Sequence, residues 1–77
     1  MNIEEIMEES LPELRKLLKK NNFAIEPDTI YGWRVTYTYP DGPDEFFGNK
    51  REFTLPHFMR EANERVAILY TLRRFTN

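Results

Sequence analysis

The chain has 77 residues, no cysteine and a formal net charge of −2, and 40% of its residues are hydrophobic. A chain this short forms a single domain, 1–77, with a modest core, and the lack of cysteine excludes a disulfide framework that would support it. The weakly acidic charge disfavours a general nucleic-acid binder, and the apolar fraction is that of a folded rather than a disordered protein. We therefore expect a small globular domain whose core is supplemented by oligomerisation or by binding, with a well-packed monomer as the alternative.

The N-terminal sequence MNIEEIMEES is acidic, whereas a secretory signal peptide begins with basic residues. The longest apolar run, VAILY, is far shorter than the roughly 18 residues that a membrane-spanning helix needs. Together, these patterns predict a cytoplasmic protein that does not use a membrane as its partner.

Residues 3–20 have the spacing of an amphipathic helix, with acidic residues early and basic residues late, as the helix dipole favours. The apolar stripe consists of Ile3, Ile6, Met7, Leu11, Leu14, Leu17 and Leu18. Pro12 would clash with the carbonyl group of Glu8 in a continuous helix, and residues 10–13 form a capping box, which is a start signal for a second helix. We therefore expect an N-terminal helix that is kinked at Pro12 or divided into two short helices sharing one face.

The segment YGWRVTYTY, residues 31–39, alternates aromatic or branched side chains with small or polar ones. The aromatic and branched positions are Tyr31, Trp33, Val35, Tyr37 and Tyr39. A period of two with these residue types predicts a strand that has one apolar face. Because the apolar face of an antiparallel sheet normally packs inward, we expect the aromatic row to line the core rather than to form an exposed platform.

Turn residues lie on both sides of this strand. Pro27 and Asp28 predict a turn before it, and PDGPDE, residues 40–45, predicts one after it. EFF is a candidate for a short return strand, and REFTL, residues 51–55, is a candidate for a third strand. The middle of the chain is therefore expected to form two or three antiparallel strands.

Thr54, Leu55 and Pro56 repeat the cap-and-proline start found at residues 10–12, and they predict a helix from about residue 55 to residue 74. Its apolar stripe consists of Leu55, Phe58, Met59, Ala62, Val66, Leu69, Tyr70 and Leu72. Apolar side chains at the margin of this stripe indicate a second packed face, and a homodimer formed through this helix would account for it. The candidate oligomer-interface residues are Ile68, Leu72 and Phe75. The predicted fold class is α+β, with the C-terminal helix packed on one face of the sheet.

No convincing catalytic constellation is present in the sequence. His57 is the only histidine, cysteine is absent, and Ser10 is better explained as a helix cap than as a nucleophile. The acidic loop at residues 41–45 has too few oxygen ligands for a calcium site, and there is no glycine-rich phosphate loop. We therefore expect neither an enzyme, nor a cofactor, nor a metal site.

An aromatic and basic cluster is the candidate partner-binding site. Phe46 and Phe47 are adjacent, and adjacent residues of a strand point to opposite faces, so one of the two rings should leave the core. That ring would lie beside Lys50 and Arg51, and aromatic rings and arginine are enriched at the centres of protein interfaces. The sequence therefore favours a non-enzymatic module that binds another protein. It would act as an adaptor or an inhibitor of a larger protein, for example as a phage or mobile-element inhibitor of a host system.

A second interpretation is a small nucleic-acid-binding regulator. The basic residues of the two predicted helices are Arg15, Lys16, Lys19, Lys20, Arg60, Arg65, Arg73 and Arg74. If several of them converge, with aromatic rings between them, they would contact phosphates and stack on bases. The pattern leaves open whether they converge on one surface.

Overall fold

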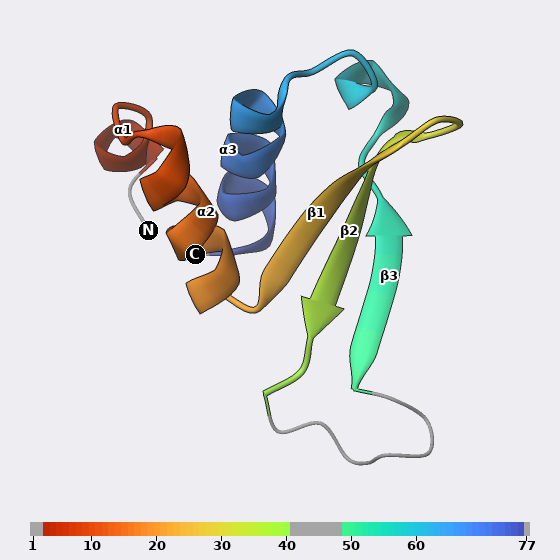
Figure 1. Ribbon diagram of the computed structural model, residues 1–77, viewed down its shortest axis with the longest axis horizontal. Coiled ribbons are helices and arrows are strands. Elements are labelled where there is room, and N and C mark those ends of the chain that lie inside the picture. Colours follow the sequence, from red (N-terminus) through yellow and green to blue (C-terminus); the bar gives the residue numbers. More distant parts are fainter. Residues whose placement is uncertain (1–2, 41–48, 77) are drawn as a thin grey trace.

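The computed structural model describes residues 3–40 and 49–76, which form a three-stranded antiparallel sheet with helices packed on one side of it (Figure 1). The strands are β1 (Phe23–Asp28), β2 (Gly32–Thr38) and β3 (Lys50–Thr54), and β2 lies between the other two. The helices are α1 (Ile3–Ile6), α2 (Leu11–Lys20), the 3-10 turn η1 (His57–Met59) and α3 (Glu64–Phe75). The predicted α+β fold is confirmed.

The N-terminal region is divided into two helices rather than kinked at Pro12. The hydroxyl group of Ser10 accepts a hydrogen bond from the backbone N–H of Glu13 at 3.4 Å and caps α2, so Pro12 lies in the first turn, where its missing N–H costs nothing. Asn21 caps the other end, and Asn22 has a φ of 68°. Both ends of α2 therefore lie where the sequence places them.

Strand β1 replaces the turn expected at Pro27 and Asp28, and this expectation was wrong. Phe23 lies opposite Tyr37, and the backbone N–H of Thr38 donates to the carbonyl group of Asn22 at 2.8 Å. Because the backbone groups of a strand point alternately to its two sides, Pro27 points away from β2. A proline is tolerated at such a position of an edge strand, since no ladder hydrogen bond is lost there.

The turn itself follows Asp28. Its Oδ1 atom accepts hydrogen bonds from the backbone N–H groups of Ile30 at 2.8 Å and Tyr31 at 2.9 Å. Gly32 then starts β2 with a φ of 90°, a conformation that favours glycine. The Asp28 side chain also receives a hydrogen bond from Arg34 at 3.0 Å, which fixes the turn against the outer face of the sheet.

The C-terminal helix begins at Glu64, so the prediction of a helix from residue 55 was wrong for its first part. Asn63 starts a new helix because its side-chain oxygen accepts the backbone N–H of Val66 at 2.9 Å. Before it, the chain forms η1 and crosses the end of the sheet, where the N–H of Leu55 donates to the carbonyl group of Trp33 at 3.0 Å.

Helices α2 and α3 pack on each other, and the core lies between them and the sheet. The fully buried apolar side chains are Leu14, Val35, Ala67, Ile68 and Leu72. A bidentate ion pair joins the two helices at the surface, with Arg15 Nε and Nη2 lying 2.7 and 2.8 Å from the carboxylate oxygens of Glu64. This hydrogen bonding lowers the pKa of Glu64 below its ordinary value.

The aromatic row of β2 lines the core only in its middle. Val35 is fully buried, and Trp33 and Tyr37 are half-buried and pack against the core. Tyr31 and Tyr39, at the two ends of the row, are 57% and 41% exposed. The core-lining prediction is therefore correct for the central positions and wrong for the terminal ones, which extend past the helices.

Candidate functional site

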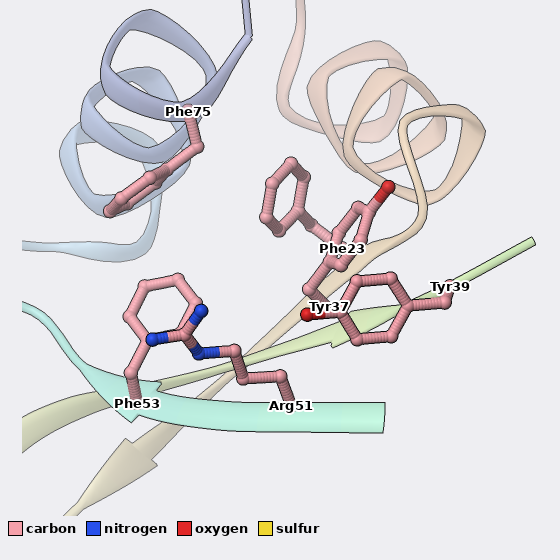
Figure 2. Close-up of a pocket in the computed structure, with 6 residues that line it drawn as sticks. All are labelled: Phe23, Tyr37, Tyr39, Arg51, Phe53 and Phe75. Carbon is pink, nitrogen blue, oxygen red and sulfur yellow. The ribbon is translucent and has the colours of Figure 1, made fainter. Parts of the chain in front are cut away.

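An open groove of about 470 Å³ lies between the end of α3 and the inner face of the sheet. Six side chains of the described residues line it: Phe23, Tyr37, Tyr39, Arg51, Phe53 and Phe75. Figure 2 shows them converging on one hollow from β1, from β2, from β3 and from the C-terminal end of α3. We call this feature, defined by these six residues, the aromatic groove.

The register of the sheet brings these side chains together. Tyr37 lies opposite Phe23 on one side and opposite Arg51 on the other, so the three side chains form a row across one face. Since residues two apart in a strand point to the same face, Phe53 and Tyr39 join this row. The alternation along three strands therefore builds most of the groove, and Phe75 closes it from the helix side.

The aromatic rings of the groove form a continuous chain of contacts. The ring centroids of Tyr39 and Tyr37 are 5.0 Å apart, and those of Tyr37 and Phe23 are 4.9 Å apart. The chain continues from Phe23 to Phe75 at 6.1 Å and from Phe75 to Phe53 at 4.9 Å. These separations lie in the favourable range for tilted and edge-to-face pairs, so the wall of the groove is held in place before any partner binds.

Two of these rings keep a large exposed surface in spite of their contacts. Tyr39 is 41% exposed and Phe75 is 44% exposed, whereas Phe23 at the bottom of the groove is buried. The groove therefore presents aromatic surface to the solvent over a buried aromatic base.

Arg51 is the charged group of the groove. Its side chain is exposed, and no carboxylate of the described residues forms an ion pair with it. Other basic side chains are paired: Lys16 with Glu13 at 3.2 Å, and Arg34 with Asp28 at 3.0 Å. Arg51 is thus available to a carboxylate of another molecule, which it can hold through a charge-assisted bidentate hydrogen bond.

The predicted partner-binding residues are only partly brought together. Phe46 and Phe47 lie outside the described residues. Lys50 and Arg51 are both exposed, but neighbouring strand residues face opposite ways, and Lys50 lines a hollow on the outer face together with Thr36 and Thr38. Of the two described members of this set, Arg51 lines the groove and Lys50 does not.

The predicted oligomer-interface residues also separate. Ile68 and Leu72 are fully buried, so neither side chain is available for contact with a second copy of the chain. Helix α3 is apolar on more than one side because it packs against α1 and α2 as well as against the rest of the core. Phe75 alone remains at the surface, in the aromatic groove.

Four residues of the groove were not predicted as site residues: Phe23, Tyr37, Tyr39 and Phe53. The available signal was the spacing of Arg51 and Phe53, which puts a cation and a ring on the same face of β3. The contribution of Phe23 depends on β1, which was not predicted as a strand.

A second surface carries aromatic and basic groups on α3. Tyr70, Arg73 and Arg74 line a hollow of about 360 Å³, and the ring of Phe58, which is 76% exposed, lies 5.8 Å from the ring of Tyr70. We call Phe58, Tyr70, Arg73 and Arg74 the α3 patch. Among the other helical basic residues, Arg15 is paired with Glu64, Lys16 is paired with Glu13, and Arg65 donates to the carbonyl group of Met7.

No group of three or more metal-ligating side chains occurs in residues 3–40 and 49–76. His57 is exposed on η1. Among the helices of the described part of the chain, none has the length and apolar character that crossing a membrane requires.

Comparison of the chain with known proteins found no matching family model, no matching curated protein and no matching solved structure. The function is therefore argued from the geometry of the site.

Proposed function

We propose that the protein is a small non-enzymatic interaction module that binds a larger protein through the aromatic groove and acts on it as an adaptor or an inhibitor. The observation that carries this proposal is the combination of an open groove, exposed faces of Tyr39 and Phe75, and the guanidinium group of Arg51, which pairs with no carboxylate of the described residues. Aromatic rings and arginine are the residue types in which interface hot spots are enriched.

The chemistry of the groove supports binding rather than catalysis. Its described lining consists of aromatic rings, two of which carry phenol hydroxyl groups, and one guanidinium group. General acid–base catalysis is most often carried out by histidine or a carboxylate, and the described lining of the groove contains neither. An apolar hollow with one fixed charge is instead suited to an apolar side chain next to a carboxylate.

The size of the chain agrees with this role. A chain of 9.3 kDa has a modest core, and binding of a partner adds stability to such a small fold. A phage or mobile-element inhibitor of a host system is one setting for a small, acidic, cysteine-free domain of this kind.

Arg51→Glu tests the proposal, with Lys50→Glu as the matched control. The two positions are adjacent in β3 and both exposed, but only Arg51 faces the groove. The tagged protein is used to capture its partner from its source cells, and the dissociation constant is then measured with both proteins purified. Loss of a charge-assisted hydrogen bond costs about 1.5–3 kcal/mol, so we expect Arg51→Glu to weaken binding by at least about tenfold.

Lys50→Glu is expected to bind like the wild type, and both variants should retain the circular dichroism spectrum and melting midpoint of the wild type. Equal binding by Arg51→Glu and the wild type would contradict the assignment of the groove. Equal loss in both variants would show a general charge effect instead of a contact in the groove.

The α3 patch supports a second candidate function, that of a nucleic-acid-binding regulator. Arg73 and Arg74 line a hollow beside Tyr70, an arrangement suited to phosphate contacts and base stacking. Binding of a labelled single-stranded oligonucleotide would then weaken steeply with added salt, because phosphate contacts release counterions. The double variant Arg73→Glu/Arg74→Glu should abolish this binding, and the absence of a complex at low salt and micromolar protein would exclude it.

A further inference from the structure

We propose that the exposed edge of β3 receives an extended segment of the partner as a fourth strand of the sheet. This segment places an acidic side chain beside Arg51 and an apolar side chain beside Phe53. The inference rests on the proposed function, since it states how the partner enters the aromatic groove.

The hydrogen-bond ladder determines which groups of β3 are free. The N–H of Leu55 donates to the carbonyl group of Trp33 at 3.0 Å, and the N–H of Tyr39 donates to the carbonyl group of Asn49 at 2.7 Å. These pairs continue the β2–β3 register in both directions. Since hydrogen-bonded pairs alternate with unbonded ones in an antiparallel ladder, Arg51 also exchanges its backbone hydrogen bonds with β2, and so does Phe53.

The backbone groups of the intervening residues, Lys50, Glu52 and Thr54, therefore point away from β2. Strand β3 is at the end of the sheet order, so these groups have no strand partner among the described residues. A row of unpaired donors and acceptors on an exposed edge is a template for another strand.

The opposite edge of the sheet is less suitable. The outward position Pro27 of β1 has no N–H group, and α2 packs against β1. Figure 1 shows α1, α2 and α3 on the β1 side of the sheet and β3 farthest from these three helices. Within the described sheet, β3 thus offers the more complete and more accessible edge.

The groove determines the side chains of the added strand. Directly opposite residues in neighbouring strands lie on the same face, so the added residues beside Arg51 and Phe53 would both face the groove. They are two positions apart in the added strand. An antiparallel segment would have the order apolar–x–acidic, and a parallel segment would have the order acidic–x–apolar.

A second copy of this chain is a poor occupant of the edge. Antiparallel self-pairing centred on Glu52 would place two glutamates opposite each other, and self-pairing centred on Arg51 would do the same with two arginines. Like charges at directly opposite positions destabilise a strand pair. A register centred on Phe53 would bring Pro56, which lacks an N–H group, opposite Lys50. A segment of another protein that carries the complementary charge avoids these conflicts.

The test uses synthetic eight-residue peptides, one with a central Phe-Thr-Glu and one with a central Glu-Thr-Phe, titrated into the ¹⁵N-labelled protein. We expect one of them to bind saturably and to shift the amide signals of Lys50, Glu52 and Thr54, whose N–H groups would acquire partners. The charge-reversed peptide with Lys in place of Glu should bind at least about tenfold more weakly, since an interaction of about 1.5–3 kcal/mol becomes repulsive.

Glu52→Pro separates strand addition from simple insertion into the groove. Proline at this position removes an outward N–H group and leaves the ladder with β2 intact, whereas the control Glu52→Thr removes the charge and keeps the N–H. We expect Glu52→Pro to lower peptide affinity at least about tenfold, as loss of a backbone pair in the new ladder requires, and Glu52→Thr to retain it. N-methylation of the peptide at alternate positions provides the same test without changing the protein.

The two proposals fail in different ways. If neither peptide binds at about 1 mM, or if Glu52→Pro and the N-methylated peptides bind like their controls, strand addition is wrong. If Arg51→Glu nevertheless abolishes capture of the natural partner, the proposed function stands without strand addition. If Arg51→Glu also has no effect on that partner, the proposed function is wrong as well.

Discussion

At the Trp33 end of the sheet, the chain that leaves β3 crosses the inner face, whereas at the Tyr39 end no described segment does so. The indole N–H of Trp33 donates to the carbonyl group of Ala62 at 2.8 Å. The neighbouring Gly32 lies so close to Arg60 that a Cβ atom added there would be 2.5 Å from the Arg60 Cα. This end is closed by backbone packed on backbone.

At the other end, the same alternating row continues through Tyr37 to Tyr39, and there it becomes the wall of an open groove. The two ends of the row have similar residue types, but only the Trp33 end is crossed by a described segment of the chain. An aromatic row therefore becomes core or binding surface according to the segment that crosses it, and substitutions at each end can test the two outcomes separately.

Gly32→Ala should have the largest effect on the closed end. The added methyl group would lie 2.5 Å from the backbone Cα atom of Arg60, with the first side-chain carbons of Arg60 also close, and the φ of 90° is unfavourable for alanine. We expect the free energy of unfolding to fall by about 2–4 kcal/mol, from backbone strain together with the displacement of η1. Chemical denaturation measures this, and Thr36→Ala, in the middle of the same strand, is the control. A loss below about 0.5 kcal/mol would show that η1 is not packed on Gly32.

Trp33→Phe should have an intermediate effect. It removes the hydrogen bond to the carbonyl group of Ala62 while keeping an aromatic ring. We expect a loss of about 1–2 kcal/mol in stability and no change in partner binding, because Trp33 is not part of the groove. Trp33 is the only tryptophan, so unfolding must be followed by circular dichroism. Weakened partner binding at unchanged stability would contradict the separation of the two ends.

Tyr39→Ser, at the open end, should weaken partner binding and leave stability nearly unchanged, which is the reverse of the result expected for Trp33→Phe. The ring is 41% exposed and contacts Tyr37 at its edge, so we expect stability to change by less than about 1 kcal/mol. Binding of the partner or of the peptides should weaken, because the ring forms part of the wall of the groove. A large loss of stability without loss of binding would place Tyr39 in the core, as the alternating pattern alone predicts.

The parts of the fold that were predicted correctly depend on short-range signals. The cap at Ser10 and the end of α2 at Asn21 follow from neighbouring residues, and so does the strand at 32–38. The third strand was also recognisable, because Phe53 and Leu55 alternate with polar residues in the segment REFTL. Each of these signals acts within a few residues of the feature it determines.

The errors concern features whose outcome depends on distant parts of the chain. Pro27 is acceptable in β1 only because β2 lies on its other side, which cannot be read from residues 23–28 alone. The apolar period of the last helix continues back through residues 55–62, yet Asn63 restarts the helix after η1. Asn63 was the available signal for this break, since asparagine before a charged first turn is a favourable cap.

Two of the described groove residues were predicted to lie at an interface: Arg51 for a partner protein and Phe75 for a second copy of the chain. The sequence identified a basic residue near aromatic rings, but the rings that line the groove come from three strands and a helix end. Ile68 and Leu72 were assigned to an oligomer interface because they widen the apolar stripe, whereas packing by α1 and α2 explains the same pattern within one copy. A broad apolar stripe therefore indicates that a helix packs on several sides. It does not distinguish packing against the same chain from packing against a second copy.

The pH dependence of stability should give the smallest effect, and it tests the turn that leads into the closed end. Hydrogen bonds from the backbone N–H groups of Tyr31 and Ile30, assisted by Arg34, hold the pKa of Asp28 below its ordinary value of 3.8. A depressed pKa in the folded state stabilises the fold fully above the ordinary value, and this contribution is lost as the pH falls through the folded pKa. The melting midpoint should therefore decrease below about pH 5.

Asp28→Asn keeps an acceptor for both N–H groups but cannot ionise. We expect it to melt lower than the wild type at pH 7 and to lose less stability in acid, so that the two melting curves approach each other at the lowest pH. Glu64→Gln is the control at a distant site, since the pKa of Glu64 is also lowered and contributes with the same sign. The alternative outcome is that Asp28→Asn leaves the fall of the melting midpoint at low pH unchanged, while Glu64→Gln makes that fall smaller. In that case, the ion pair between α2 and α3 controls the response to acid. The turn before Gly32 would then depend on the geometry of its acceptor and not on its charge.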